Sequence, residues 1–152
     1  MTVVVQAGAM YDSVLVPTDG SDGTDEAVTH AIDIAEQYGA TLHTVYVVES
    51  TRTNETPGDD PLGRVRDAGQ NAVDRVAERA RSAGVTAVEA SVARGVPANE
   101  ILAYVEDHGV DVTVMATAGR SGESRALLGS VAESVVRESP VPVLLVNVGE
   151  TL

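Results

Sequence analysis

The sequence predicts an α/β protein with an open, doubly wound, five-stranded parallel sheet of strand order 3-2-1-4-5 and helices on both faces. Short runs rich in Val and Leu alternate with longer segments in which apolar residues recur at helical spacing. The short runs are apolar throughout, which is typical of parallel strands buried on both faces. Right-handed crossovers between such strands place a helix against either face of the sheet.

The first half of the chain is expected to form a strand, a helix and a second strand. Residues 13–17 and 41–48 are too short for helices and rich in β-branched residues, so both indicate strands. The segment between them has an apolar helical face made of Ala27, Val28, Ala31, Ile32, Ala35 and Tyr38. Gly39 follows as the expected end of this helix. Residues 49–63 have no periodicity and predict a loop.

The second half continues the alternation. A helix is expected on the apolar face Leu62, Val65, Ala68, Ala72, Val73, Val76 and Ala80, ending at Gly84. Residues 85–93 then predict the third strand. A helix follows from Pro97, which suits a first turn, to Gly109. Residues 110–116 predict the fourth strand, 130–138 a short helix, and 142–148 the fifth strand.

The length of 152 residues fits a single domain, which we place at residues 11–152 after an N-terminal extension of residues 1–10. The extension is an extra strand, a frayed tail, or the product of a start codon upstream of a true start at Met10. The chain has no Cys and, read through, no Lys. These absences exclude disulfides, thiolate metal sites, Schiff-base chemistry and lysine-dependent phosphate loops.

The net charge is strongly negative: 10 basic minus 23 acidic residues gives −13. Nucleic acid is therefore not an expected partner, because phosphate-backbone affinity comes from cationic side chains. No apolar stretch reaches the roughly 20 residues of a membrane span, and no positive region opens a signal peptide. We expect a soluble cytoplasmic protein. Acidity with Arg in place of Lys suggests adaptation to concentrated salt, and an ordinary acidic protein is the alternative.

Two loops are expected to meet at the carboxyl edge of the sheet, where ligands of doubly wound folds bind. The first strand is followed by Pro17, Thr18 and Asp19, and then by Gly20 and Ser21. Asp19 is suited to accept hydrogen bonds from a ribose hydroxyl or to hold Mg²⁺ indirectly, through water. The alternative is a plain turn followed by a helix N-cap, since Asp, Gly and Ser are common at both.

The second loop follows Met115 and Ala116 at the end of the fourth strand. It contains Gly119 and Arg120, and it ends at Gly129 and Ser130, where the last helix begins. Glycines allow a ligand to approach the backbone, and a helix N-terminus favours an anion such as phosphate. The alternatives are a capping box between Ser130 and Glu133, and a solvated surface role for Arg120.

Three segments of the chain resemble the universal stress protein family. They are VLVPTDGS, ARGVPANEIL and VMATAGRSGESRALLGSVAESVVRESPVPVLLV, and the resemblance runs from about residue 11 to residue 148. The most specific motif of the family is G-x2-G-x9-G-S/T. Gly119, nine further residues and the pair Gly129-Ser130 match it, whereas Ala116 stands at the first glycine.

The resemblance implies a site for ATP or ADP. Matching positions place Pro17 and Asp19 beside the nucleoside, Val47 against adenine through its backbone, and Met115 and Ala116 close to the nucleoside. Gly119, Gly129, Ser130 and Val131 would surround the phosphates. The methyl group of Ala116 is expected to cost roughly 1–3 kcal/mol of binding free energy if nothing relaxes, or about a 10- to 100-fold loss of affinity.

Three functions remain open. The first is a nucleotide-binding regulatory protein of the stress response, which binds ATP or ADP. The second is a slow ATPase or phosphotransferase on the same site, which the absence of His, Lys and Glu among the predicted positions disfavours. The third is a nucleotide-free homodimeric interaction module. We expect a homodimer through the fifth strand, because an apolar edge strand otherwise stays open to uncontrolled pairing.

His30, His43 and His108 lack metal-ligand spacing, so a structural or exposed role is expected for them.

Overall fold

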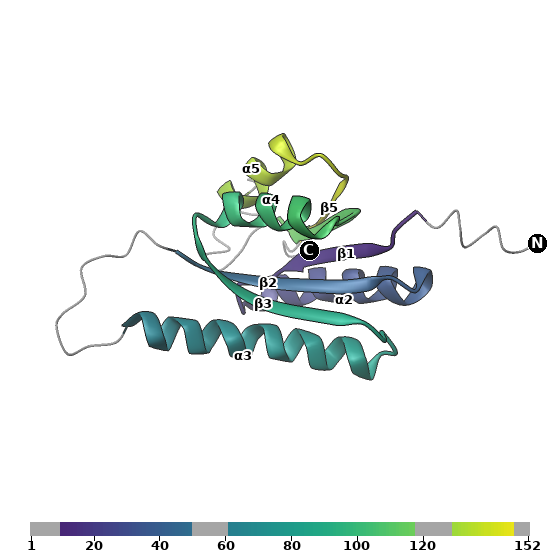
Figure 1. The fold of residues 1–152 in the computed structure, drawn as a ribbon, viewed down its shortest axis with the longest axis horizontal. Helices are drawn as coiled ribbons and strands as arrows, with labels where there is room; N and C mark the ends of the chain where they lie inside the picture. The colour runs from purple at the N-terminus through teal and green to yellow at the C-terminus, as the bar shows by residue number, and fades with distance from the viewer. Residues whose placement is uncertain (1–9, 50–60, 118–128, 148–152) are drawn as a thin grey trace, which may run out of the picture.

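The structure, a computed structural model, describes residues 10–49, 61–117 and 129–147, with side chains from residue 63 onward in the second range. Five parallel strands form one sheet of order β3-β2-β1-β4-β5, so the expected fold class and strand order are confirmed (Figure 1). The elements are β1 (Ser13–Pro17), α2 (Asp22–Tyr38), β2 (Thr41–Glu49), α3 (Pro61–Ser82), β3 (Val88–Gly95), α4 (Pro97–His108), β4 (Val112–Ala116), α5 (Ser130–Glu138) and β5 (Val143–Val146).

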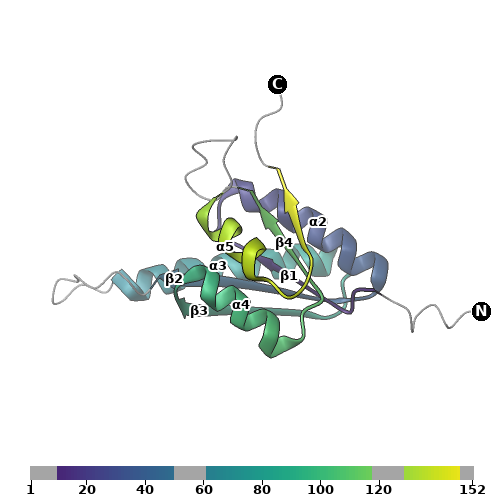
Figure 2. The ribbon, with the colours of Figure 1, turned by 90° about the horizontal axis from the view of Figure 1, so that it is seen from above.

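The helices cover both faces of the sheet. Helices α2 and α3 lie on one face and α4 and α5 on the other (Figures 1 and 2). One apolar cluster joins α2 and the C-terminal half of α3 to β1 and β4, and a second joins α4 and α5 to the opposite face. The central strands β1, β2 and β4 are mostly buried on both sides, which explains their largely apolar sequences, whereas the edge strands β3 and β5 are partly exposed.

The third strand begins later than predicted, at Val88 instead of residue 85. Val85 is buried at 4 % exposure, and its backbone N–H donates to the carbonyl of Ala80, 3.0 Å away. Its apolar side chain therefore serves the end of α3, with Gly84 turning the chain at φ +107°. The fifth strand is shorter than predicted, Val143–Val146 instead of 142–148, and Val148 lies outside the described residues.

Helix α3 approaches β2 closely at Gly69. A Cβ atom built on Gly69 would lie 2.5 Å from Cδ1 of the Tyr46 ring. Tyr46 is 7 % exposed and belongs to a third apolar cluster with Val48, Ala72 and Val73. Glycine at this helical position therefore allows the tyrosine ring to pack closely against α3.

Among the described helices, none is long and apolar enough to cross a membrane. Residues 1–9 of the expected N-terminal extension lie outside the described part of the chain, and Met10 is exposed.

Candidate functional site

A cavity of about 420 Å³ opens at the carboxyl ends of β1, β2 and β4. Strand order reverses here, because the chain passes from β1 to β2 on one side and later returns to β4 on the other. The walls come from six elements, β1, α2, β2, α4, β4 and α5, and from their connections. The lining residues are Pro17, Thr18, Asp19, Thr24, Val45, Tyr46, Val47, Glu49, Pro97, Ile101, Met115, Ala116, Thr117, Gly129, Ser130, Val131 and Ala132.

The cavity brings together most of the residues singled out in the sequence. Nine of the eleven predicted positions line it: Pro17, Thr18, Asp19, Val47, Met115, Ala116, Gly129, Ser130 and Val131. The other two, Gly119 and Arg120, lie outside the described residues. Loops that are about a hundred residues apart in the sequence therefore line the same cavity.

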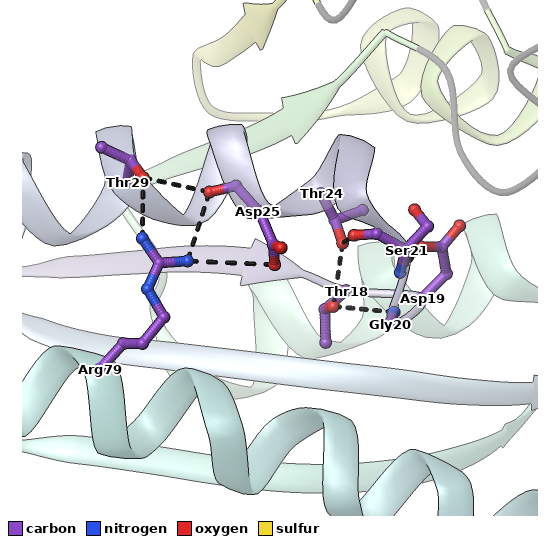
Figure 3. A network of polar contacts seen from close by, with 8 residues as sticks. All are labelled: Thr18, Asp19, Gly20, Ser21, Thr24, Asp25, Thr29 and Arg79. Carbon is purple, nitrogen blue, oxygen red and sulfur yellow. Dashed lines mark hydrogen bonds and ion pairs between the residues drawn. The ribbon is translucent and has the colours of Figure 1, made fainter.

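The turn after β1 is held by its own side chains. The backbone N–H of Thr18 donates to the carbonyl of Val45 at 3.0 Å, which fixes the exit of β1 against β2. The hydroxyl of Thr18 accepts the Gly20 N–H at 3.0 Å and lies 3.1 Å from the hydroxyl of Thr24 (Figure 3). Because Thr24 Oγ1 donates to the Ser21 carbonyl at 2.8 Å, the hydrogen between the two threonines comes from Thr18.

Asp19 takes part in the turn after β1 and also lies on the cavity wall. Its Oδ1 accepts the backbone N–H of Ser21 at 2.9 Å, so the carboxylate stabilises the turn. The same residue lines the cavity. Ser21 is the N-cap of α2, yet its side chain makes no capping bond, and its Oγ is buried without a partner within the described residues.

Helix α5 begins at the cavity because its first residues are tied to the end of β4. The Thr117 N–H donates to the carbonyl of Val146 at 3.0 Å, and the Gly129 N–H donates to the carbonyl of Thr117 at 2.7 Å. Gly129 is the N-cap, and its carbonyl accepts the first helical bond from Glu133. The next N–H groups, from residue 130 to residue 132, thus have no acceptor in the helix and belong to residues that line the cavity.

The capping box between Ser130 and Glu133 is wrong. Ser130 is the first residue inside α5, and no side chain of the described residues makes a capping hydrogen bond there. The Glu133 carboxylate instead pairs with Arg137 one turn later, at 3.0 Å. A glycine N-cap has no side chain with which to satisfy the terminal N–H groups, and these groups stay available to an anion.

Ala116 departs from the family glycine without backbone strain. None of the described non-glycine residues has a positive φ. Ala116 is 9 % exposed and belongs to the apolar cluster beneath α2, together with Val28 and Val146. Its methyl group therefore fills part of the core at the edge of the cavity.

Sequence reasoning missed several wall residues. Tyr46 and Glu49 lie on β2, and Thr24, Pro97 and Ile101 come from the first turns of α2 and α4. Glu49 ends β2, so the rule that carboxyl ends of parallel strands share an edge could have found it. Tyr46 gave no signal, because its side chain alternates with that of Val47 and reads as ordinary core.

The side chains that line the cavity in the described part of the chain are either acidic or neutral. Asp19 and Glu49 carry its carboxylates, and no His, Lys or Arg lines it within the described ranges. The same part of the chain contains no group of three or more residues suited to hold a metal ion. The donors for an anion on this wall are the N–H groups at the start of α5.

The histidines lie elsewhere. His43 on β2 is 5 % exposed, and its Nδ1 lies 2.7 Å from the Tyr104 hydroxyl on α4. The Tyr104 ring stacks on His108 with centroids 3.8 Å apart. Burial lowers the pKa of His43, opposed by the nearby Glu89 carboxylate and reinforced by His108. His30 is exposed on α2. None of the three lines the cavity.

Residues 10–147 match the sequence profile of the universal stress protein family. The chain belongs to this family. A universal stress protein of Methanocaldococcus jannaschii is 38 % identical over 142 residues, which cover 91 % of this chain and 83 % of that protein.

Solved structures of family members share the fold. The M. jannaschii protein MJ0577 has a TM-score of 0.83 at 26 % identity, covering 93 % of this chain and 99 % of the other. A universal stress protein solved in complex with cAMP has a TM-score of 0.68 at 29 % identity, covering 92 % of this chain and 99 % of the other. Both alignments extend over nearly the whole universal stress protein chain.

Proposed function

We propose that the cavity binds an adenine nucleotide, ATP or ADP, and that the protein is a cytoplasmic, nucleotide-responsive regulator of the stress response. The observation that carries the proposal is the convergence of the β1 turn, the end of β4 and the uncapped N-terminus of α5 on one cavity. The cAMP complex of a family member at 29 % identity supports a nucleotide as the class of ligand.

Each wall has a role in this proposal. The nucleoside lies beside Pro17, Thr18 and Asp19, with adenine against the backbone at Val47 and the ribose near Met115 and Ala116. The phosphates lie at Gly129, Ser130 and Val131, where free N–H groups and the helix dipole favour negative charge. Gly119 and Arg120, the two other phosphate-site positions expected from the sequence, lie outside the described residues. Asp19 is the carboxylate placed to hold Mg²⁺ through water.

The decisive experiment is calorimetric titration of the purified protein with Mg-ATP, preceded by analysis of the ultraviolet spectrum for nucleotide retained from expression. With no Trp and four Tyr, bound adenine would dominate that spectrum. Gly129→Val is expected to weaken binding at least tenfold, because a branched side chain crowds the start of α5. Ser134→Val, on the same helix but not on the cavity wall, is the control and should leave the affinity unchanged.

Ala116→Gly tests the departure from the family motif. We expect it to tighten ATP binding, because the backbone after β4 could then approach the ribose more closely. The variant loses a methyl group from the core, so its free energy of unfolding must be measured separately from its affinity. Equal affinities for wild type and variant would show that the methyl group does not meet the ligand. A wild type that binds no ATP would refute the nucleotide proposal.

A slow ATPase on the same site is favoured by one observation, the Glu49 carboxylate on the cavity wall. A carboxylate within reach of a water molecule can serve as a general base. Phosphate release above an enzyme-free blank, abolished by Glu49→Gln with ATP affinity retained, would establish it. Release at the blank rate leaves the protein as a binder.

We also propose a homodimer through β5, with or without nucleotide. Strand β5 is at the edge of the sheet, and Leu144 on it is 41 % exposed. Sedimentation in high salt should give a dimer for wild type and a monomer for Leu144→Asp. Val65→Asp, equally exposed on α3, is the control and should remain dimeric. A monomeric wild type would contradict the proposal.

A further inference from the structure

Helix α3 concentrates positive charge in a strongly acidic chain. Five of the ten basic residues lie on it, Arg64, Arg66, Arg75, Arg79 and Arg81. Its acidic residues are three, Asp67, Asp74 and Glu78, so the helix has a charge of 5 minus 3, or +2, while the whole chain has −13. The net charge of α3 is thus opposite in sign to that of the whole chain, which suggests that its arginines have a function of their own.

Two of these arginines face one groove. Arg64, Ala68, Asn71 and Arg75 follow one another at intervals of four, three and four residues, which places them on a single face of α3. Together with Asp19, Gly20 and Tyr46 they line a space of about 670 Å³ between α3 and the turn after β1. Ala68, with its small side chain, lies between the two arginines in this series along the helix.

The Arg75 guanidinium lies against the turn after β1. Its Nη2 is 3.9 Å from the point that a Cβ atom on Gly20 would occupy, and Gly20 has φ +82°. Any side chain at this position would be strained and would enter the space beside Arg75. Glycine at position 20 therefore keeps the groove open on the side that faces the arginine.

The groove arginines differ from Arg79 on the same helix. Arg79 reaches across to α2, where it donates to the Thr29 hydroxyl at 2.8 Å and lies 3.9 Å from the Asp25 carboxylate (Figure 3). Arg64 and Arg75 make no hydrogen bond or ion pair with any residue that the structure describes. Asp74, the nearest acidic neighbour of Arg75 in the chain, accepts a bond from Gln70 instead. Within the described part of the chain, the guanidinium donors of Arg64 and Arg75 therefore have no acceptor.

We propose that this groove is an anion site for a phosphate-type oxyanion, separate from the nucleotide cavity. Guanidinium groups bind tetrahedral oxyanions through paired, planar N–H donors, and the Asn71 amide adds a neutral donor between them. Asp19 stands at the far side of the groove with its Oδ1 engaged by the Ser21 N–H, so the anion lies on the α3 side, away from the carboxylate.

The groove and the nucleotide cavity share two walls, Asp19 and Tyr46. Tyr46 is buried against Gly69 of α3 and contributes to the walls of both spaces. The occupant of the groove is either a free phosphate or pyrophosphate ion or, in place of the position at α5 proposed above, a phosphoryl group of the nucleotide in the cavity. The chemistry is the same, and the experiment separates these sources.

The test is calorimetric titration of the full chain with inorganic pyrophosphate at low salt. Wild type is expected to bind it, and the double variant Arg64→Gln/Arg75→Gln to lose at least tenfold in affinity. The matched control is Arg66→Gln/Arg81→Gln, on the same helix with the same change of charge but outside the groove, and it should stay within about twofold. Absence of binding by wild type, or an equal loss in the control, would overturn the proposal.

A second arm separates the groove from the nucleotide site. Gly129→Val should bind pyrophosphate as wild type does, because the groove does not involve α5. Loss of pyrophosphate binding in that variant would place the ion at α5 and refute the groove. Wild type saturated with ATP should still bind pyrophosphate if the source is a free ion. If ATP and pyrophosphate compete, and Arg64→Gln/Arg75→Gln also lowers the affinity for ATP, the occupant of the groove is a phosphoryl group of the nucleotide. Because pyrophosphate is titrated alone first, the outcome does not depend on whether ATP binds.

Discussion

The carboxylate of Asp111 accepts a hydrogen bond from the backbone N–H of Ser13 at 3.0 Å, and the Asp111 N–H in turn donates to the Ser13 carbonyl at 2.9 Å. The same carboxylate oxygen accepts the Asp12 N–H at 2.8 Å. These bonds join the start of β1 to the start of β4, two strands that are separated by about a hundred residues. One side chain thus fixes the register of the central strand pair at the edge opposite the cavity.

Asp111→Ala is expected to lower the free energy of unfolding by about 1–2 kcal/mol, because two backbone N–H groups lose a charged acceptor in a partly exposed place. Asp111→Asn keeps an oxygen acceptor and should lose less. Urea unfolding followed by circular dichroism measures both. Asp107→Ala, at an exposed site on α4, is the control, and a loss of equal size there would remove Asp111 from this role.

Stability should fall as the pH is lowered below about 6.5, because His43 has a lowered pKa in the folded protein. The unfolded chain then binds more protons than the folded one, so acid favours unfolding, and the loss grows until the pH reaches the folded pKa. His43→Gln should flatten the dependence of the unfolding midpoint on pH between 7.5 and 5. His30→Gln, at an exposed site on α2, should retain the wild-type slope. Parallel slopes in all three proteins would contradict the assignment to His43.

Gly69→Ala should destabilise the fold by about 1–3 kcal/mol through overpacking, although alanine is the better helix former by about 1 kcal/mol. The new methyl group would lie 2.5 Å from the Tyr46 ring. In the Tyr46→Val background, Gly69→Ala should cost less stability than it does in wild type, because the ring that it would meet is no longer there. Thermal unfolding of the four proteins gives the coupling, and additive effects would show that the two residues do not interfere.

Thermal stability should rise with KCl, because the charge of −13 repels itself at low salt and is screened when the Debye length falls to about 3 Å. A gain of about 2 kcal/mol would raise the midpoint by roughly 4–8 °C in a chain of this size. The variant Glu26→Gln/Asp33→Asn/Glu36→Gln, neutral at three exposed positions of α2, should depend less on salt. A wild-type midpoint that ignores KCl would show that the acidity is no adaptation to salt.

Most of the fold was predictable because period and length agree in nearly every segment. The strand 13–17 and the helix that ends at Gly39 are each bounded by residues with strong local preferences, and the structure has them where the sequence placed them. The start of β3 was not predictable from local pattern. Val85 is as apolar as a strand residue, and only the packing of α3 decides that it closes the helix.

Site residues at the ends of strands and the starts of helices were predictable from the sequence. Site residues that depend on the packing of distant segments were not. Asp19 and Gly129 stand at the ends of strands and at the start of helices, positions that topology alone brings to one edge. Tyr46 becomes a wall residue because Gly69, far along the chain, leaves room for its ring. The α3 groove was missed for a similar reason, since Arg64 and Arg75 become neighbours of Gly20 only through the docking of α3.

The turn after β1 has a thermodynamic consequence for any ligand that reaches the cavity. Its conformation is set by hydrogen bonds of Thr18, Thr24 and Asp19 with groups of the turn itself. The entropy of ordering this wall is therefore lost when the protein folds and not when a ligand binds. A ligand that reaches the cavity meets a preorganised surface. Breaking one of those bonds would shift that entropic loss onto the binding step, so a variant such as Thr24→Val would weaken association without removing a single atom that touches the ligand's phosphates.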